Sequence, residues 1–334
     1  MGKKILRLFL FIGTPISLYF VPWLIVKAWI LPLPDSLQGQ LNQALDHGFD
    51  GILLHIDQPG KPPVQLAAGY HNREQQEPAR PNALYKIASI SKLYDVVALT
   101  KLAAQGTLSL DSSLATYLPE INLPDANRIT LRNLVQHRSG LPNFTDAPGF
   151  WGGPHLEFEE CLALIEGQPA LFEPGSDSSY CNTNYLLLDR IMNNALGERH
   201  FDYLQREVLL PLGLTSTYAS LAEAPYEAVM SGYHKGYEPD LKDQEHGMVA
   251  SAADIAAFVR ALNEGTLFTA EEAELYPYAY GHGGWVPGYQ SFVSYSRKDS
   301  VVMVALYNTT DSDLYNWNLS QVVNGRLLKI YRKG

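Results

Sequence analysis

A helical pattern over residues 85–105 carries apolar side chains on nearly all of its circumference. The pattern is formed by Ile90, Leu93, Val96, Val97, Leu99, Leu102 and Ala103. A surface helix would keep a polar face, whereas a helix that is apolar all round is buried. Gly106 predicts its end. The chain must therefore place other layers of structure around this helix.

Sequence patterns in the rest of residues 35–334 predict the helices and strands that form those layers. Helical patterns cover residues 36–47, 185–192, 252–262 and 314–330, and strand patterns cover residues 51–57, 64–70, 290–296 and 301–308. Between about residues 110 and 245 the chain shows short helical patterns broken by Pro and Gly. This order predicts an α+β fold over residues 35–334, in which a sheet flanked by helices receives a mostly helical insertion.

Composition excludes several classes of function. The chain has 334 residues, 46% hydrophobic and 18% charged, which indicates a folded protein. The net charge is −10, and residues 35–334 alone carry −14, so a nucleic-acid partner is not expected. The nine histidines and two cysteines show no metal-ligand spacing, and neither a metal nor a cofactor is expected. Cys161 and Cys181 could pair in an oxidising compartment, but two separate buried thiols are favoured.

The first 34 residues differ from the body. Leu8 to Val26 is free of charge, and as a helix this run of 19 residues would span about 28 Å, close to the thickness of a bilayer core. Lys3, Lys4 and Arg7 precede it, which places the N-terminus in the cytoplasm. The expectation is a single-pass anchor in the inner membrane with a periplasmic body. A cleaved signal peptide and a buried core helix are the alternatives.

The clearest chemical signal is Ser89-Ile90-Ser91-Lys92, placed on the apolar helical pattern. Residues three apart on a helix share a face, so the Lys92 amine can reach the Ser89 hydroxyl. A serine hydroxyl becomes a useful nucleophile when a neighbouring base takes its proton. Because one Ser-x-x-Lys is expected by chance in a chain of this length, the buried setting is what makes the pair a candidate.

Two later motifs add polar groups of the right kind. Tyr180-Cys181-Asn182 precedes a helical run, and its phenol and amide could carry a proton and orient a substrate carbonyl. His282-Gly283-Gly284-Trp285 opens the late strands, and its glycines allow a substrate backbone to lie against a strand edge. Tyr70-His71-Asn72 and His234-Lys235-Gly236 repeat these forms in places that favour ordinary surface structure.

The three motifs in this order resemble those of the penicillin-recognising serine hydrolases. That family includes class C β-lactamases, D,D-carboxypeptidases, D-aminopeptidases and related esterases. Supporting stretches are residues 134–142, 172–175 and 247–251, and the similarity runs from about residue 38 to 330. The resemblance implies a β-lactamase-like antiparallel sheet flanked by helices.

The resemblance also implies a role for each motif residue. Ser89 would be acylated, Lys92 would activate it, and Tyr180 would act as general acid and base. Asn182, His282, Gly284 and Trp285 would bind substrate. The backbone N–H groups of Ser89 and Trp285 would form the oxyanion hole.

The third motif departs from one branch of the family. Class C β-lactamases carry Lys-Thr-Gly where this chain has His282-Gly283-Gly284. The expectation is therefore a membrane-anchored serine hydrolase that acts on a peptide or other small molecule, D,D-carboxypeptidase-like or a related peptidase or esterase. A class C-like β-lactamase and a non-catalytic ligand sensor are the alternatives.

Overall fold

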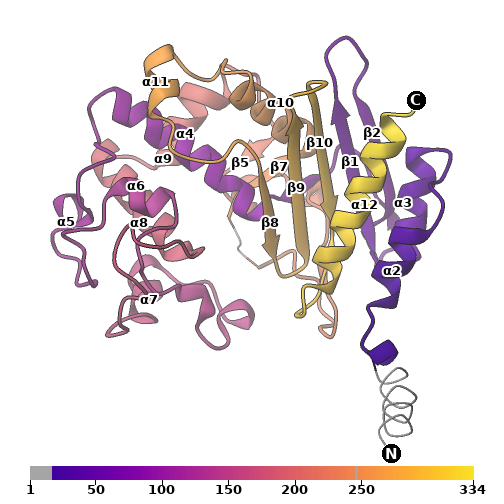
Figure 1. Cartoon of the computed structure of the whole chain (residues 1–334), viewed down its shortest axis with the longest axis horizontal. Coiled ribbons are helices and arrows are strands. Elements are labelled where there is room, and N and C mark those ends of the chain that lie inside the picture. Colours follow the sequence, from indigo (N-terminus) through magenta and orange to yellow (C-terminus); the bar gives the residue numbers. More distant parts are fainter. Residues whose placement is uncertain (1–16, 245–246) are drawn as a thin grey trace, which may run out of the picture.

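The computed structural model describes residues 17–244 and 247–334 (Figure 1). Its α-helices are α2 Trp23–Ile30, α3 Leu37–Leu45, α4 Ser91–Ala104, α5 Leu114–Tyr117, α6 Leu131–Val135, α7 Phe158–Ala163, α8 Asn182–Leu196, α9 His200–Leu204, α10 Ala252–Asn263, α11 Ala270–Leu275 and α12 Tyr315–Tyr331. Short 3-10 turns that concern the site are η1 Ala88–Ile90, η2 Phe144–Asp146 and η3 Phe150–Gly152. The strands are β1 Gly51–Asp57, β2 Val64–Asn72, β3 Glu77–Pro78, β4 Leu84–Lys86, β5 Thr217–Tyr218, β6 Tyr233–His234, β7 Val249–Ser251, β8 His282–Val286, β9 Tyr289–Ser296, β10 Val301–Tyr307 and β11 Thr309–Thr310.

The main sheet joins the two ends of the body. Its six strands run in the order β3-β2-β1-β10-β9-β8, and each neighbouring pair is antiparallel. β1 pairs directly with β10, so residues about 250 positions apart in sequence form the middle of the sheet. β8 is left at one edge, with one side of its backbone unpaired within this sheet.

The two faces of this sheet are covered by different helices. Ile52, Leu54 and Ile56 of β1 pack in one core with α3 and α12, and the alternate residue Leu53 packs in the other core, which contains α4 and α10. The period of two along β1 is what allows one strand to serve both layers. In the core that contains α4 and α10, Tyr94 of α4 stacks on Phe258 of α10 with ring centroids 3.7 Å apart. The fold class α+β expected from the sequence is therefore confirmed.

Between α4 and β7 most of the described secondary structure is helical, and turns and loops connect its short helices. α5 to α9 lie here, together with the two-residue strands β5 and β6. β4, β7 and β5 form a second antiparallel sheet, in which β4 precedes α4 and β7 follows this region.

Most expected elements appear within a few residues of their predicted bounds, but the expected helix over 85–105 is wrong at its start. Residues 84–86 pair with β7 as β4, and the helix begins only at Ser91. The physical reason lies at Ala88, whose φ of +50° interrupts a right-handed helix. Ser89 consequently lies on a tight turn between a strand and a helix.

The predicted membrane helix over Leu8–Val26 lies partly outside the described residues. Within them, residues 17–19 are helical, the chain turns at 20–22, and α2 begins after Pro22. Because proline lacks an N–H and restricts its neighbour, a single helix through Val26 is not formed. In the described part of the chain, no helix combines the length and the apolar character needed to cross a membrane. α2 packs instead on α12, with Ala28 buried.

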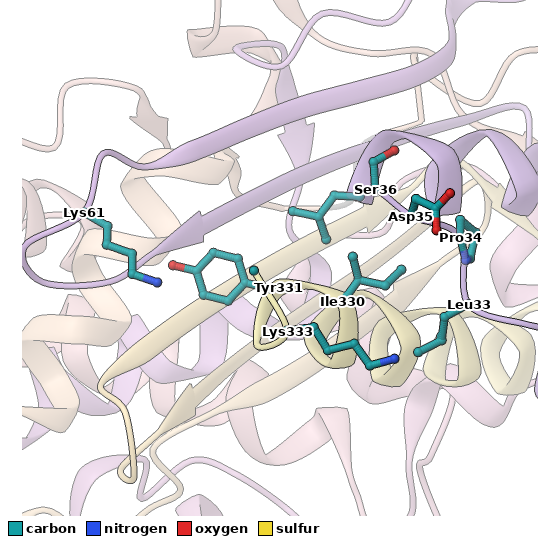
Figure 2. Close-up of a pocket in the computed structure, with 10 residues that line it drawn as sticks. Leu33, Pro34, Asp35, Ser36, Lys61, Ile330, Tyr331 and Lys333 are labelled. Carbon is teal, nitrogen blue, oxygen red and sulfur yellow. The ribbon is translucent and has the colours of Figure 1, made fainter.

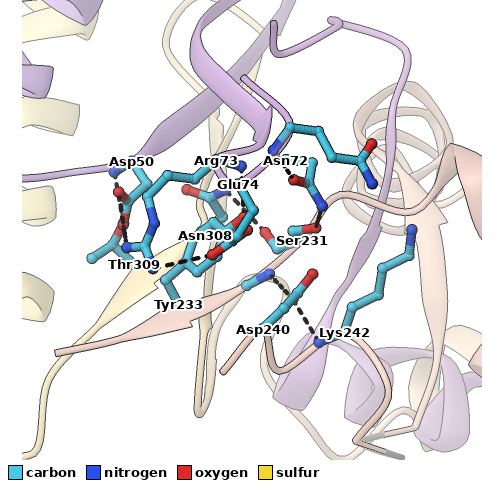
Figure 3. A network of polar contacts seen from close by, with 12 residues as sticks. Asp50, Asn72, Arg73, Glu74, Ser231, Tyr233, Asp240, Lys242, Asn308 and Thr309 are labelled. Atoms are coloured by element: carbon cyan, nitrogen blue, oxygen red, sulfur yellow. Dashed lines mark hydrogen bonds and ion pairs between the residues drawn. The ribbon is translucent and has the colours of Figure 1, made fainter. Parts of the chain in front are cut away.

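A polar network fixes the end of β2 against residues 231–242 (Figure 3). Tyr233 accepts a hydrogen bond from the Arg73 backbone N–H at 2.7 Å and donates one to Glu74 at 2.7 Å. Asp50 pairs with the Arg73 guanidinium at 3.3 Å and accepts from the Thr309 hydroxyl at 3.0 Å. The network joins the sheet to the segment that precedes β7.

The two cysteines do not form a disulfide. Cys161 lies on α7 and Cys181 directly before α8, and both are buried free thiols. This confirms the favoured expectation of separate thiols.

Candidate active site

Ser89 lies half-buried on η1, immediately after the left-handed Ala88. A non-glycine residue in this conformation is uncommon and costs free energy, which the surrounding packing must offset. Ala88 is buried, and the neighbouring carbonyl of Ile87 accepts a hydrogen bond from the Ser291 hydroxyl of β9 at 2.7 Å. These contacts hold the Ser89 side chain toward α8.

Lys92 lies one turn beyond Ser89, in the first turn of α4, and is only 7% exposed. Its Nζ donates to the Ser89 hydroxyl at 3.4 Å and to Oδ1 of Asn182 at 3.0 Å. The same nitrogen lies 5.3 Å from the ring centroid of Tyr180 and 5.0 Å from that of Tyr185. The hydrogen-bond partners of the amine are therefore neutral groups.

Tyr180 completes the contact around the nucleophile. Its hydroxyl donates to the Ser89 hydroxyl at 2.7 Å. Its ring lies against the His137 ring, with centroids 4.4 Å apart and planes tilted by 33°. The phenol is thus in direct reach of the serine oxygen, and a second ring fixes its orientation.

Asn182 is the first residue of α8, and its amide is held from both sides. Nδ2 donates to the Thr145 hydroxyl at 3.0 Å, while Oδ1 accepts from Lys92. Its backbone N–H donates to Oδ1 of Asn143 at 2.9 Å. Asn143 lies directly before η2 and Thr145 lies within it. Neither residue belongs to a motif that sequence reasoning could have used.

The edge strand β8 passes close to the nucleophile because Gly284 has no side chain. A Cβ at this position would lie 2.5 Å from the Ile87 carbonyl oxygen and 2.3 Å from Oγ of Ser291. Real Cβ atoms do not approach other atoms so closely, so only glycine fits here. The absence of a side chain brings the backbone of β8 beside the turn that carries Ser89.

His282 is linked to His137 through Tyr278. The Tyr278 hydroxyl lies 2.9 Å from Nε2 of His282 and 3.4 Å from Nε2 of His137. Nδ1 of His282 contacts the Gly283 carbonyl and must donate to it, because a carbonyl only accepts. Nδ1 of His137 accepts from the Cys181 backbone N–H at 3.2 Å.

Burial and the charge of Lys92 determine the protonation states of His137 and His282. Burial lowers the pKa of His137 to about 4, helped by the charge of Lys92. Burial also lowers the pKa of His282, and Lys92 acts in the same direction. Both rings are therefore neutral near pH 7. In neutral His282, Nδ1 donates to Gly283 and Nε2 accepts from Tyr278, so the ring presents no free N–H.

Aromatic side chains from both halves of the molecule meet beside β8. Trp285 packs edge-to-face on Trp151 of η3, with centroids 5.7 Å apart, and lies 6.3 Å from the His234 ring. In the stretch 276–280, Tyr278 joins the site, whereas Tyr276 packs against Phe268. Trp285 thus places an apolar surface next to the polar groups.

The structure brings the candidate residues from the three motifs into one place. Ser89, Lys92, Tyr180 and Asn182 are joined by hydrogen bonds, Gly284 touches the turn that carries Ser89, and the ring of His282 lies 6.3 Å from that of Tyr180. Sequence reasoning missed Asn143 and Thr145. The aromatic stretch 276–280 hinted at an apolar pocket wall, with ordinary core packing as the alternative, and the polar contacts of Tyr278 were not foreseen. His137 lies within the stretch 134–142 that already supported the resemblance, so a signal for it was present.

Comparisons with known proteins identify the family of the chain. The sequence profile described as Beta-lactamase matches residues 35–277. PbpX of Bacillus subtilis, which is named as a penicillin-binding protein, is 26% identical over 326 residues. The match covers 89% of this chain and 78% of PbpX. Protein flp of Staphylococcus aureus is 26% identical over 193 residues, which cover 55% of this chain and 39% of flp.

Solved structures show the same fold. D-amino acid amidase from Ochrobactrum anthropi superposes with a TM-score of 0.78 at 23% identity, covering 89% of this chain and 97% of that one. The hydrolase EstCE1 gives a TM-score of 0.67 at 21% identity, covering 90% of this chain and 99% of that one. Taken with the profile match over most of the body, these findings show that the chain belongs to the β-lactamase family of serine hydrolases.

Proposed function

We propose that this enzyme hydrolyses an amide or ester through an acyl-enzyme on Ser89, with a substrate that carries no carboxylate on its leaving group. The observation that carries the proposal is the set of hydrogen bonds that joins Ser89, Lys92 and Tyr180. The likeness to D-amino acid amidase and to penicillin-binding proteins supports a small acyl substrate.

The proposed reaction uses each side chain in turn. The Lys92 amine takes the Ser89 proton as Oγ bonds to the substrate carbonyl carbon. The N–H groups of Ser89 and Trp285 bind the resulting oxyanion. Tyr180 gives its proton to the leaving amine or alcohol as that bond breaks, and recovers one from Lys92. Water then attacks the acyl-enzyme, the same groups move its proton, and Ser89 is released.

The state of His282 supports the choice of substrate. A lysine at this position would offer a cation to a substrate carboxylate. Neutral His282 offers neither a charge nor a free N–H, since Tyr278 and Gly283 occupy its two nitrogens. The proposal therefore favours amides and esters over peptides that end in a free D-alanine carboxylate, and over a class C-like β-lactamase activity.

A kinetic comparison tests the nucleophile. Ser89→Ala is expected to lower kcat on a p-nitrophenyl ester and on a D-amino acid amide by at least about 10³-fold. Ser91→Ala removes a hydroxyl two residues away on the same turn and should retain activity. Equal activity of wild type and Ser89→Ala on every substrate cleaved would refute the mechanism. No turnover of any ester, amide, D-alanyl peptide or penicillin by wild type would favour a ligand sensor.

The proposed location is the outer side of the inner membrane, with the N-terminal segment as attachment. Large apolar side chains are exposed together along residues 18–30, namely Leu18, Tyr19, Phe20, Trp23, Leu24, Trp29 and Ile30. A cavity of about 500 Å³ lies between the start of α3 and the end of α12, and Lys61 and Lys333 line it (Figure 2). Exposed aromatic and other apolar side chains along one segment are typical of attachment at a membrane interface.

Cell fractionation tests this location. The full chain is expected in the membrane fraction and resistant to high-salt extraction, because apolar side chains and not charge alone hold it there. Protease added to spheroplasts should release the body. Recovery of the full chain in the soluble fraction, or a body that external protease does not reach, would contradict the proposed location.

A further inference from the structure

A cluster of two carboxylates and an imidazole lies behind Lys92. Asp95 is on α4, one turn beyond Lys92, Asp189 is on α8, and His200 is the first residue of α9. One ligand atom from each lies within 4.8 Å of the other two. The side chains of Asp95 and His200 are 9% and 17% exposed, while that of Asp189 is 38% exposed.

A neighbouring amide fixes which nitrogen of His200 is available. Oδ1 of Asn193 lies 2.6 Å from the His200 backbone nitrogen and 3.0 Å from its Nδ1. The backbone N–H must donate to this oxygen, so the atom is the amide oxygen, and it can only accept from Nδ1 as well. Nδ1 therefore carries a proton, and Nε2 is the nitrogen that faces the two carboxylates. Histidines that bind metals show this same orientation.

The spacing of the three atoms fits ligands of a metal better than hydrogen-bond partners. Nε2 lies 3.4 Å from Oδ1 of Asp95 and 3.6 Å from Oδ1 of Asp189. A charge-assisted N–H to carboxylate bond is about 2.7–2.9 Å long. Four ligands bonded at about 2.1 Å around a tetrahedral ion lie about 3.4 Å apart. Oδ1 of Asp189 is also buried, and among the described residues it has no hydrogen-bond partner.

The charges of the cluster call for a cation. Two carboxylates in one partly buried cluster repel each other unless a positive charge lies between them. Either a proton on His200 or a metal ion between the three groups would offset the two carboxylates, and the spacing described above favours the metal.

We propose that this cluster binds one Zn²⁺ ion, which joins α4, α8 and α9. Two carboxylate oxygens and one imidazole nitrogen are ligands that zinc takes, with water at the fourth position. Mg²⁺ and Ca²⁺ prefer sites made of oxygen alone. The partly exposed side chain of Asp189 provides a path for the ion. The site does not depend on the reaction proposed at Ser89.

Metal binding to the untagged full chain tests the assignment. After removal of metals with a chelator, the protein is titrated with Zn²⁺ by calorimetry, and Co²⁺ provides a visible spectrum that reports a tetrahedral site. We expect one ion per chain and a higher melting temperature with Zn²⁺. His200→Gln and Asp189→Asn should each weaken binding by at least about tenfold. His155→Gln removes an exposed histidine elsewhere and should bind as wild type does.

The outcomes separate a zinc site from a protonated histidine. No stoichiometric uptake, or uptake that survives both His200→Gln and Asp189→Asn, would overturn the proposal and leave His200 as a buried cation. Equal affinity for Mg²⁺ would overturn the choice of zinc. Circular dichroism checks the fold of each variant. Asp189→Asn keeps the size of a side chain that is partly exposed, so this variant is expected to fold. It remains usable if His200→Gln does not fold.

Discussion

At the scale of single residues, His282 sets the chemistry beside the nucleophile. Its nitrogens are occupied by Tyr278 and Gly283, and burial together with Lys92 keeps it neutral. We predict that His282→Lys raises the ratio of kcat/KM for a D-alanyl-D-alanine peptide over its C-terminal amide by at least about tenfold, the worth of one charge-assisted contact.

The pair of substrates differs only in the carboxylate, so other effects of the substitution cancel in the ratio. Tyr278→Phe serves as a control, since it frees Nε2 of His282 without adding a charge, and a smaller change is expected. A wild-type enzyme that already prefers the free carboxylate would contradict the assigned specificity.

His137 is a second residue whose environment makes a measurable prediction. In the unfolded chain a histidine takes up a proton near pH 6.5, whereas folded His137 does so only near pH 4. Between these values the unfolded state binds more protons, so stability is full above about pH 6.5 and falls as the pH drops toward 4. The contribution lost is on the order of 3 kcal/mol.

Urea unfolding between pH 4.5 and 7.5 measures this slope. His137→Asn should flatten it, since asparagine tolerates the φ of +56° at this position and offers an oxygen to the Cys181 N–H. His155→Gln, at an exposed site, should leave the slope as in wild type. An unchanged slope in His137→Asn would show that His137 is not buried as a neutral ring.

Single residues also mark the limit of what the sequence predicts. Ser89, Lys92, Tyr180 and Asn182 belong to short motifs whose spacing carries their chemistry, and the structure brings them together. Tyr278, Asn143 and Thr145 act by position alone, so no local pattern distinguishes them. Asp95, Asp189 and His200 come from three helices, so the spacing of histidines along the chain carries no signal for the zinc site proposed here.

At the scale of elements, the close approach of β8 and η1 shapes the site. Gly284 allows it, because a Cβ there would lie 2.5 Å from the Ile87 oxygen. Gly284→Ala is expected to push β8 from the turn that carries Ser89 and to lower kcat/KM by at least about a hundredfold, since small displacements at a reacting centre are costly.

Gly281→Ala is the matched control for this prediction. A Cβ there would lie 3.4 Å from its nearest neighbour, the Val293 carbonyl oxygen, so little needs to move. Steady-state kinetics and thermal melting of both variants separate a local effect from unfolding. Full activity in Gly284→Ala would show that the approach of β8 does not position the site.

The element scale also contains the main failure of the sequence prediction. Apolar periodicity located α4 well at its C-terminal end but extended it through residues 85–90. Periodicity does not report a backbone turn such as the one at Ala88, and strand pairing with β7 depends on residues more than 160 positions away. β1, β10 and α10 lie close to their predicted bounds although β1 and β10 pair across the sequence, because local signals such as the Ser251 cap of α10 mark where each element begins.

At the scale of the whole molecule, the N-terminal segment is held to the C-terminal helix by Arg326. This buried guanidinium donates to Gln40 at 2.7 Å, to Gln43 at 3.0 Å, and to the carbonyls of Leu31 and Pro32 at 2.7 and 2.8 Å. Arg326→Met should lower the free energy of unfolding by about 3 kcal/mol, because it leaves these acceptors without their donor.

Lys329→Met changes an exposed residue one turn along α12 and should cost less than about 0.5 kcal/mol. Neither variant should change kcat/KM, because α12 covers the opposite face of the sheet from α4. Urea unfolding and steady-state kinetics on the same preparations check both statements. A loss of activity without a loss of stability in Arg326→Met would contradict the assignment of a purely stabilising role to Arg326.

The central claim is that Ser89 becomes acylated, and mass spectrometry of the quenched reaction tests it most directly. With a slowly hydrolysed ester, the account predicts that the intact protein gains the mass of one acyl group, and that the added mass maps to the peptide containing Ser89. The adduct should be absent from Ser89→Ala and present in Ser91→Ala. Turnover without any adduct, or an adduct on another residue, would contradict it.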